Sequence, residues 1–208
     1  LYSLRQCPYA MRARVGLLLA KQQVILRDVD MKNKPTDMLT ASPKATVPVL
    51  VINPSKVIDQ SLDIMLWALS KNDPHQLLHG DQTAMFELID RTDNEFVDAL
   101  KKYKAASRYH DDEKDTYRSH CEAYICDLEQ RLTQHQYRMG DSPSLADYAV
   151  LPFIRQFSRV ERQWYRQASY PLTQRWLNKH YQQTVFTQAM APYKPWHKGD
   201  TAILFGEP

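Results

Sequence analysis

A cysteine stands where a helix is expected to begin, and its thiol is the group of this chain best placed to do chemistry. Cys7 opens the run CPYA, which follows a short apolar stretch at 1–4 and precedes an alanine- and leucine-rich stretch. Pro8 has the φ angle favoured at the first helical position and lacks an N–H that the helix could not use there. Cys7 would then cap the helix, where free N–H groups and the helix dipole favour thiolate over thiol. We therefore predict a reactive thiol, against the alternative of a small buried cysteine beneath a helix.

A proline that leads into a β-strand is the second informative feature. Pro48 stands between Val47 and Val49, and proline removes a donor from a strand ladder, so it is tolerated mainly at strand starts and edges. We expect a cis Val47–Pro48 bond, which would turn the backbone of Val47 toward an extended peptide ligand. An ordinary trans proline at a strand start is the alternative.

A third group of residues lies between a short β run and a helix. Ser61 and the first N–H groups of this helix could receive a carboxylate, and Gln60 offers both a donor and an acceptor to an amino-acid headgroup. Asp59 precedes them. Taken alone, the three residues also fit a plain helix cap.

Composition restricts the class of protein. The chain has 208 residues, a hydrophobic fraction of 43% and a net charge of +3, which neither requires nor excludes a nucleic-acid partner. No apolar run approaches the roughly 20 residues of a membrane span, and no signal-peptide pattern is present. Three cysteines fit a reducing compartment better than a disulfide framework. We expect a cytoplasmic protein with no membrane partner.

The order of β-like and helical stretches predicts two domains. Residues 1–70 alternate in the order βαβ-α-ββα, with turn chemistry at 53–55 between two β runs. Residues 71–80 are polar, contain a proline and a glycine, and read as a linker. Residues 81–208 show the 3.6-residue period of helices. We therefore predict an α/β domain at 1–70, a linker at 71–80, and an all-α bundle with a tail at 81–208.

These motifs, in this order, resemble the glutathione transferase superfamily, most closely its cysteine-containing omega-like and glutaredoxin-like classes. The resemblance covers nearly the whole chain and implies a thioredoxin-like first domain. It rests on CPYA, KNKP at 32–35, VPVL at 47–50, QS at 60–61, the helical second half, and SLADYAVLPF at 144–153. In the last motif Ser144 and Asp147 are similar to the capping box of the family, a structural feature.

The resemblance also implies a glutathione site. Cys7 would form a mixed disulfide with glutathione, and Val47, before a cis Pro48, would pair its backbone with the cysteinyl part. Gln60 and Ser61 would hold the γ-glutamyl end. Two further residues are Lys34, which matches a lysine near the glycyl carboxylate, and Asp59, which could replace Gln60, since omega-like members usually carry Glu there. Lys34 also fits a solvated charged turn.

Ala10 stands where a CxxC pair would have its second cysteine, so a second glutathione must release Cys7. We predict a thioltransferase, acting on a small-molecule or protein disulfide or as a dehydroascorbate reductase, with glutathione as cosubstrate and no metal. One alternative is conjugation of glutathione to electrophiles, with Ser3 or Tyr9 as the available hydroxyl. The other is a binding or assembly protein without turnover.

Several remaining residues suggest weaker sites. Aromatic side chains that could line a substrate pocket are Tyr9, Tyr109, Phe157 and Trp164. Arginines recur at spacings of four, three and four, at 155, 159, 162 and 166, and indicate a solvated helix face or a dimer contact rather than a nucleic-acid surface. His75 and His79 lie in the linker, a poor setting for a metal site. We expect a homodimer and no nucleic-acid partner.

Overall fold

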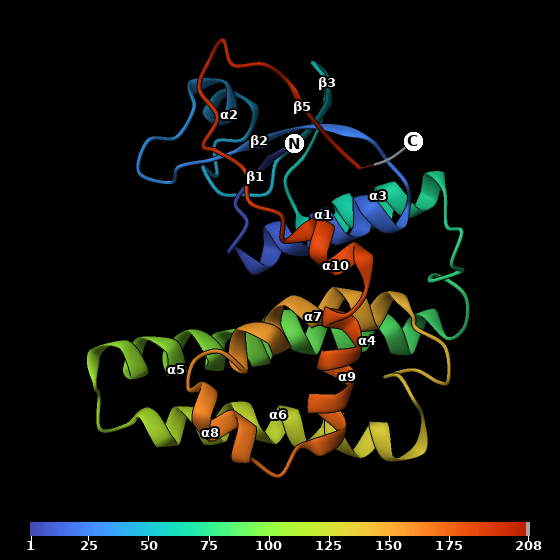
Figure 1. Ribbon diagram of the computed structural model, residues 1–208, viewed down its shortest axis with the longest axis vertical. Coiled ribbons are helices and arrows are strands. Elements are labelled where there is room, and N and C mark those ends of the chain that lie inside the picture. The colour runs from blue at the N-terminus through green and yellow to red at the C-terminus, as the bar shows by residue number, and fades with distance from the viewer. Residues whose placement is uncertain (207–208) are drawn as a thin grey trace. The chain divides into compact units, whose positions relative to one another are not determined.

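The computed structural model describes residues 1–206 and divides the chain into two compact units (Figure 1). The first contains Leu1–Gln76 and the chain from Gln183 onward, and the second contains Leu77–Gln182. The elements of the first unit are β1 (Tyr2–Ser3), α1 (Pro8–Leu19), β2 (Val24–Asp28), α2 (Thr36–Ala41), β3 (Leu50–Asn53), β4 (Lys56–Ile58), α3 (Ser61–Lys71), α10 (Thr184–Ala189) and β5 (Ile203–Phe205). Those of the second are α4 (Gln82–Arg91), the π-helical turn η1 (Thr92–Phe96), α5 (Val97–Tyr109), α6 (Lys114–Gln134), α7 (Leu145–Phe157), α8 (Arg162–Gln167) and α9 (Pro171–Tyr181).

The strands of the first unit confirm the predicted βαβ-α-ββα order. β1 pairs in parallel with β2, and β3 and β4 form an antiparallel hairpin. Tyr2 and Val49 exchange two backbone hydrogen bonds of 2.8 and 3.0 Å, which join the hairpin strand to β1. Because of this pairing, the residues that follow β1 and precede α1 lie beside the segment that enters β3.

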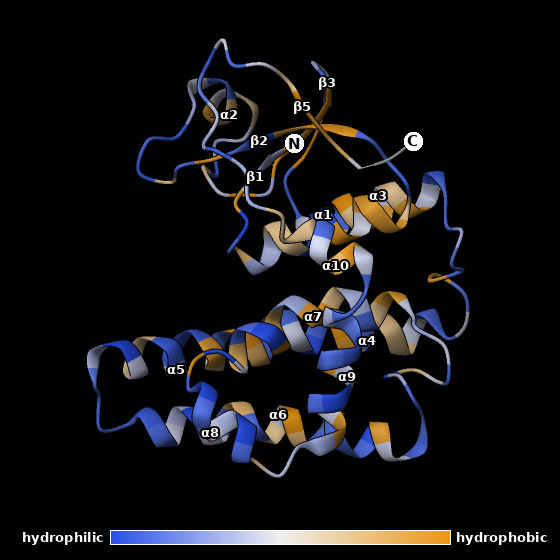
Figure 2. Cartoon of the chain, viewed as in Figure 1, coloured by the Kyte–Doolittle hydropathy of each residue, from blue (hydrophilic) through white to orange (hydrophobic). Residues whose placement is uncertain are grey.

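Helices α1 and α3 pack closely because a glycine lies at their contact. A Cβ atom on Gly16 of α1 would lie 2.8 Å from the Cα of Met65 in α3, which is closer than real Cβ atoms approach a backbone. Gly16 therefore permits a separation that any other residue would prevent. Hydrophobic residues run along α3 (Figure 2), and Ile64, Met65 and Ala68 are fully buried. Their burial holds α1 in a fixed position relative to the hairpin that precedes α3.

The second unit is entirely helical and is organised around one buried carboxylate. Asp147 accepts hydrogen bonds from the N–H and the hydroxyl of Ser144, both at 2.9 Å, which confirms the predicted capping box at the start of α7. Asp147 also accepts from the Arg138 backbone at 3.0 Å and from Trp176 Nε1 at 2.9 Å. Four donors compensate its burial.

Among the described residues, no helix is both long and apolar enough to cross a membrane.

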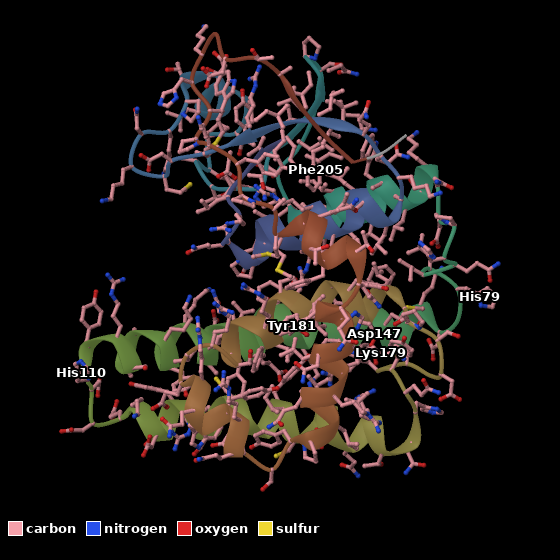
Figure 3. The ribbon with its side chains drawn as sticks, viewed as in Figure 1. His79, His110, Asp147, Lys179, Tyr181 and Phe205 are labelled. Atoms are coloured by element: carbon pink, nitrogen blue, oxygen red, sulfur yellow. The ribbon has the colours of Figure 1, made fainter. Side chains whose placement is uncertain are left out.

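The domain boundaries differ from the predicted ones, which placed an α/β domain at 1–70, a linker at 71–80 and a helical domain with a tail at 81–208. The first unit continues to Gln76, and the chain from Gln183 returns to it. β5 adds to the edge of β2 in antiparallel register, with Val24 opposite Phe205. The Phe205 side chain lies between this strand and α1, where the Arg14 guanidinium carbon is 5.9 Å from its ring centroid (Figure 3). The tail was assigned to the helical domain because a three-residue strand has too short a pattern to show in the sequence.

We predict that Phe205→Ala destabilises the protein by about 3 kcal/mol, because it removes a large buried ring. Phe205 is 2% exposed, whereas its neighbour Leu204 is 62% exposed and serves as the matched control. Leu204→Ala should change stability by less than about 0.5 kcal/mol. Urea unfolding of the two variants measures both values. Equal effects would contradict a tail that packs as part of the first unit.

Candidate functional site

Cys7 lies at the N-cap of α1, as the sequence predicts. Its backbone is extended, with φ −77° and ψ 123°, and Pro8 is the first helical residue. The Cys7 carbonyl accepts the first helical hydrogen bond from Met11 N–H at 2.9 Å, and the Cys7 N–H donates to Leu4 at 3.0 Å. Both backbone groups are thus used to fix the helix start, and the side chain stands at the positive end of the helix dipole.

The thiol faces the turn that enters β3. Cys7 Sγ lies 3.8 Å from the carbonyl oxygen of Val47 and donates a weak hydrogen bond to it. The Val47–Pro48 bond is cis, which confirms the prediction. Val47 is 40 residues from Cys7 in the chain. The fold brings it to the thiol because Val49, two residues later, is paired with β1.

An apolar cluster supports the thiol from behind. Cys7 is partly buried and packs against a cluster of buried side chains from β1, α1, α2 and the loops: Tyr2, Ala10, Val29, Met38, Val47 and Val49. Trp196 of the C-terminal segment packs against the same cluster. The backbone N–H of Trp196 donates to the Asp28 carbonyl at 2.8 Å, which holds Trp196 beside this cluster. The tail was expected with the helical domain, so Trp196 was not among the site residues predicted from the sequence. The cluster limits the positions that Cys7 can adopt.

Gln60 and Ser61 lie at the start of α3. Gln60 is the N-cap, is exposed, and makes no side-chain capping hydrogen bond, while Ser61 is the first helical residue and is 5% exposed. Asp59 is already occupied, because its two oxygens accept from Ser42 Oγ and Lys44 Nζ, each at 2.7 Å. These bonds, that from Lys44 first, hold the pKa of Asp59 below its usual range. Of the two side chains, Gln60 therefore retains its hydrogen-bonding capacity for a ligand.

Lys34 lines a cavity of about 360 Å³ in the first unit. One wall is the loop that enters α2 and the first turn of that helix, with Asn33 and Asp37, and the other is the C-terminal segment at 195–198. Lys198 Nζ lies 3.6 Å from Asp37 Oδ1 and links the two walls. From the sequence, Lys34 fits either a solvated charged turn or a binding site. In the structure it lines a cavity that the C-terminal segment helps to form.

Of the two hydroxyls considered from the sequence, Ser3 is fully buried in β1. Its Oγ accepts a hydrogen bond from Arg14 Nε at 2.7 Å. Tyr9 lies in the first turn of α1 and is half-buried. The Arg14 bond commits the Ser3 hydroxyl to the interior of the unit.

The three aromatic residues suggested in the second unit have different environments. Phe157 is 1% exposed, and its ring meets that of Trp164 edge-to-face with centroids 6.0 Å apart. Tyr109 ends α5 and is 74% exposed. Phe157 is therefore a core residue of the helical unit, with Trp164 packed on its edge.

The other two cysteines lie on α6 in the second unit. Cys121 is fully buried, and burial raises the pKa of its thiol to about 12, so it stays protonated. Cys126 is exposed and lies 4.0 Å from the Tyr170 hydroxyl. Neither has the N-terminal helix position of Cys7. In residues 1–206 no group of three or more His, Cys, Asp and Glu side chains is arranged to hold a metal ion.

Two family models match the sequence. The model described as "Glutathione S-transferase, N-terminal domain" matches residues 1–76. The model described as "Glutathione S-transferase, C-terminal domain" matches residues 92–183. Together the two matches cover most of the chain. A comparison with curated protein sequences gives no match.

The solved structures with a similar fold include the following three glutathione transferases. A glutathione transferase family member from Pseudomonas fluorescens, with two glutathione bound, has 15% identity, a TM-score of 0.78, and coverage of 91% of this chain and 90% of that chain. Glutathione transferase F2 from Populus trichocarpa has 18% identity, a TM-score of 0.77 and coverages of 91% and 95%. Glutathione transferase Omega 3C from Trametes versicolor has 19% identity, a TM-score of 0.75 and coverages of 93% and 89%. At these identities the comparison shows a shared fold.

We predict that Asp59→Asn destabilises the protein at pH 7 by at most about 1 kcal/mol, because Lys44 is half exposed and solvent weakens the ion pair. The pKa of Asp59 is depressed in the folded state, so its contribution is present above the unfolded pKa of about 3.9 and is lost as pH falls through the folded pKa. Urea unfolding from pH 7 to pH 2 should show the two proteins converging in acid.

Asp112→Asn is the control for this titration, because Asp112 is exposed and belongs to no ion pair in the described part of the chain. Its unfolding midpoint at pH 7 should equal that of the wild type. A difference between Asp59→Asn and the wild type that persists at pH 2 would contradict the assignment.

Proposed function

Because the chain belongs to the glutathione S-transferase family, we propose that its first unit binds glutathione and that Cys7 exchanges disulfides with it. The substrate class is a glutathionylated or oxidised thiol compound, either a small molecule or a protein, and dehydroascorbate is a related acceptor. Glutathione is the cosubstrate. The observation that carries the proposal is the Cys7 thiol at the N-terminus of α1, 3.8 Å from the Val47 carbonyl.

The placement of the cysteines supports a mechanism with one enzyme thiol. Ala10 stands one helical turn after Cys7, so α1 offers no second thiol. The remaining cysteines of the chain lie on α6 in the other unit. Free glutathione therefore has the resolving role.

The proposed cycle has two exchanges. The Cys7 thiolate attacks the glutathione sulfur of a mixed disulfide, forms a Cys7–glutathione disulfide, and releases the substrate as a thiolate that takes up a proton. A second glutathione thiolate then attacks the glutathione sulfur on Cys7, which forms oxidised glutathione and restores the Cys7 thiolate. The net reaction joins the glutathionyl group of the mixed disulfide to one reduced glutathione, which gives oxidised glutathione and the substrate thiol.

The first unit offers groups for each part of glutathione. The backbone N–H and C=O of Val47, next to the cis Pro48, suit the cysteinyl residue as an added strand. Gln60 and Ser61 at the start of α3 suit the γ-glutamyl headgroup, since free N–H groups at a helix N-terminus attract a carboxylate. Lys34 in its cavity suits the glycyl carboxylate.

The burial of Ser3 makes the hydroxyl-dependent alternative weaker. Its Oγ has no exposure and is committed to Arg14, so it has no route to a glutathione sulfur. A thiol at a helix N-terminus also argues against a purely structural role for the fold. The homodimer and the cytoplasmic location expected from the sequence stay predictions.

We predict that oxidised glutathione at neutral pH adds one glutathionyl group to the wild-type protein and none to Cys7→Ser, as read by intact mass. Excess reduced glutathione should remove the adduct. Cys126→Ser is the matched control, because Cys126 is more exposed than Cys7 but lies on α6. It should react like the wild type. A folded wild-type protein that stays unmodified would contradict the exchange mechanism.

We also predict that Gln60→Ala weakens the binding of reduced glutathione about tenfold, because it removes a hydrogen bond to a charged headgroup. Titration calorimetry measures the dissociation constant. Gln167→Ala, which changes an exposed glutamine on α8, should bind like the wild type. Should Asp59→Ala weaken binding while Gln60→Ala does not, the assignment of the headgroup contact to Gln60 would be wrong.

A further inference from the structure

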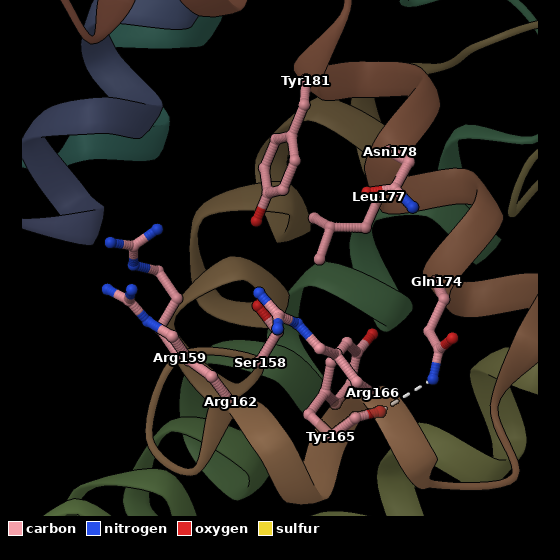
Figure 4. Close-up of a pocket in the computed structure, with 9 residues that line it drawn as sticks. All are labelled: Ser158, Arg159, Arg162, Tyr165, Arg166, Gln174, Leu177, Asn178 and Tyr181. Atoms are coloured by element: carbon pink, nitrogen blue, oxygen red, sulfur yellow. Dashed lines mark hydrogen bonds between the residues drawn. The ribbon is translucent and has the colours of Figure 1, made fainter.

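The helical unit contains a second hollow that is strongly basic. Its volume is about 290 Å³, and it lies among the end of α7, α8 and α9 (Figure 4). Its cationic lining residues are Arg159, Arg162 and Arg166. Its floor is apolar, with Leu177 3% exposed and Tyr165 5% exposed. All of its lining residues belong to the second unit.

The arginines meet there because the helix ends earlier than their spacing suggests. Their spacing in the sequence fits one face of a continuous helix, but α7 ends at Phe157 and α8 begins at Arg162. Arg159 therefore lies in the turn between them, while Arg162 and Arg166 are one turn apart on α8. Figure 4 shows Arg159 and Arg162 extending in the same direction, with the Tyr181 hydroxyl pointing toward the arginine side of the pocket. Because of this turn, the arginines line a pocket instead of forming a stripe along one face of a helix.

Acidic side chains do not neutralise these arginines. None of the three has an ion pair in the part of the chain that the structure describes. Glu161, the acid within their sequence run, is bound elsewhere, because it accepts from Tyr103 Oη at 2.7 Å, Lys114 Nζ at 2.7 Å and Arg118 Nη1 at 3.0 Å. The lining contains three cations and no carboxylate, so the pocket has an unbalanced positive field.

The pocket also contains an unsatisfied donor. The Tyr165 hydroxyl is buried and has no hydrogen-bond partner, which is rare because such a group costs about 1–3 kcal/mol. The Asn178 side chain lines the pocket and is bonded to no other described group. Tyr181 shares a hydrogen bond with Ser158 at the rim. Guanidinium, phenol and amide groups thus line one pocket together with the apolar Leu177 side chain.

We propose that this pocket binds a small phosphate monoester. Three guanidinium groups suit a doubly charged, tetrahedral oxyanion, since each can donate two parallel hydrogen bonds to it. The volume accommodates a compact organic group, which the Tyr165 ring and Leu177 would contact. This site uses none of the groups assigned to glutathione and is independent of Cys7.

Calorimetric titration of the whole protein with phenyl phosphate at low ionic strength tests the proposal, with benzoate as the singly charged comparison. Phenyl phosphate should bind more tightly than benzoate. Arg162→Gln and Arg166→Gln should each weaken phenyl phosphate binding about tenfold, since each removes a charged hydrogen-bond donor. Arg175→Gln is the matched control, because Arg175 is an exposed arginine on α9 outside the pocket. It should leave the affinity unchanged. Equal losses for all three variants, or no binding by the wild type at millimolar phenyl phosphate, would overturn the proposal.

Tyr165→Phe separates a binding role from a structural one. If the hydroxyl waits for a ligand, its removal should keep or raise the thermal midpoint of the free protein and weaken phenyl phosphate binding several-fold. Loss of stability with unchanged affinity would show that the hydroxyl already has a structural partner and would overturn its role in the pocket. Glutathionylation of Cys7 should be unchanged in each of these variants.

Discussion

A buried arginine is the constraint on which the first unit depends. Arg14 is fully buried in α1, and it donates from Nη2 to Asp28 on β2 at 2.5 Å and from Nε to Ser3 on β1 at 2.7 Å. It also donates to the Ala189 carbonyl of α10 at 3.3 Å. Burial lowers the pKa of Arg14, and the Asp28 carboxylate opposes that effect. One side chain thus fixes the helix that carries Cys7 against two strands and the returning tail, and its loss would leave Asp28 buried without its partner.

The fixed helix accounts for the geometry of the thiol. With α1 held to β1 and β2, and with Val49 paired to Tyr2, the Cys7 sulfur and the Val47 carbonyl lie 3.8 Å apart. A peptide that pairs with Val47 would therefore bring its own sulfur to the helix N-terminus. The same packing encloses Ser3 in the interior of the first unit.

The parts that sequence reasoning could predict are those whose signal is local. Two helix starts could be predicted from neighbouring residues alone, one from Pro8 after Cys7 and one from Asp147 three residues after Ser144. Both are present in the structure. The position of β5 depends on a partner 180 residues earlier, and only long-range pairing reveals it. The arginine run was ambiguous for a related reason, because its meaning depends on where α7 ends. Charge spacing alone cannot show that a turn brings side chains around a hollow.

A crystal structure of the wild-type protein after reaction with oxidised glutathione tests the central claim most directly. We expect a disulfide between Cys7 Sγ and the glutathione sulfur, with the Val47 backbone paired to the cysteinyl residue. We also expect the γ-glutamyl end at the start of α3. A glutathione bound at this place with its sulfur directed away from Cys7, or a disulfide formed only on Cys126, would contradict that claim.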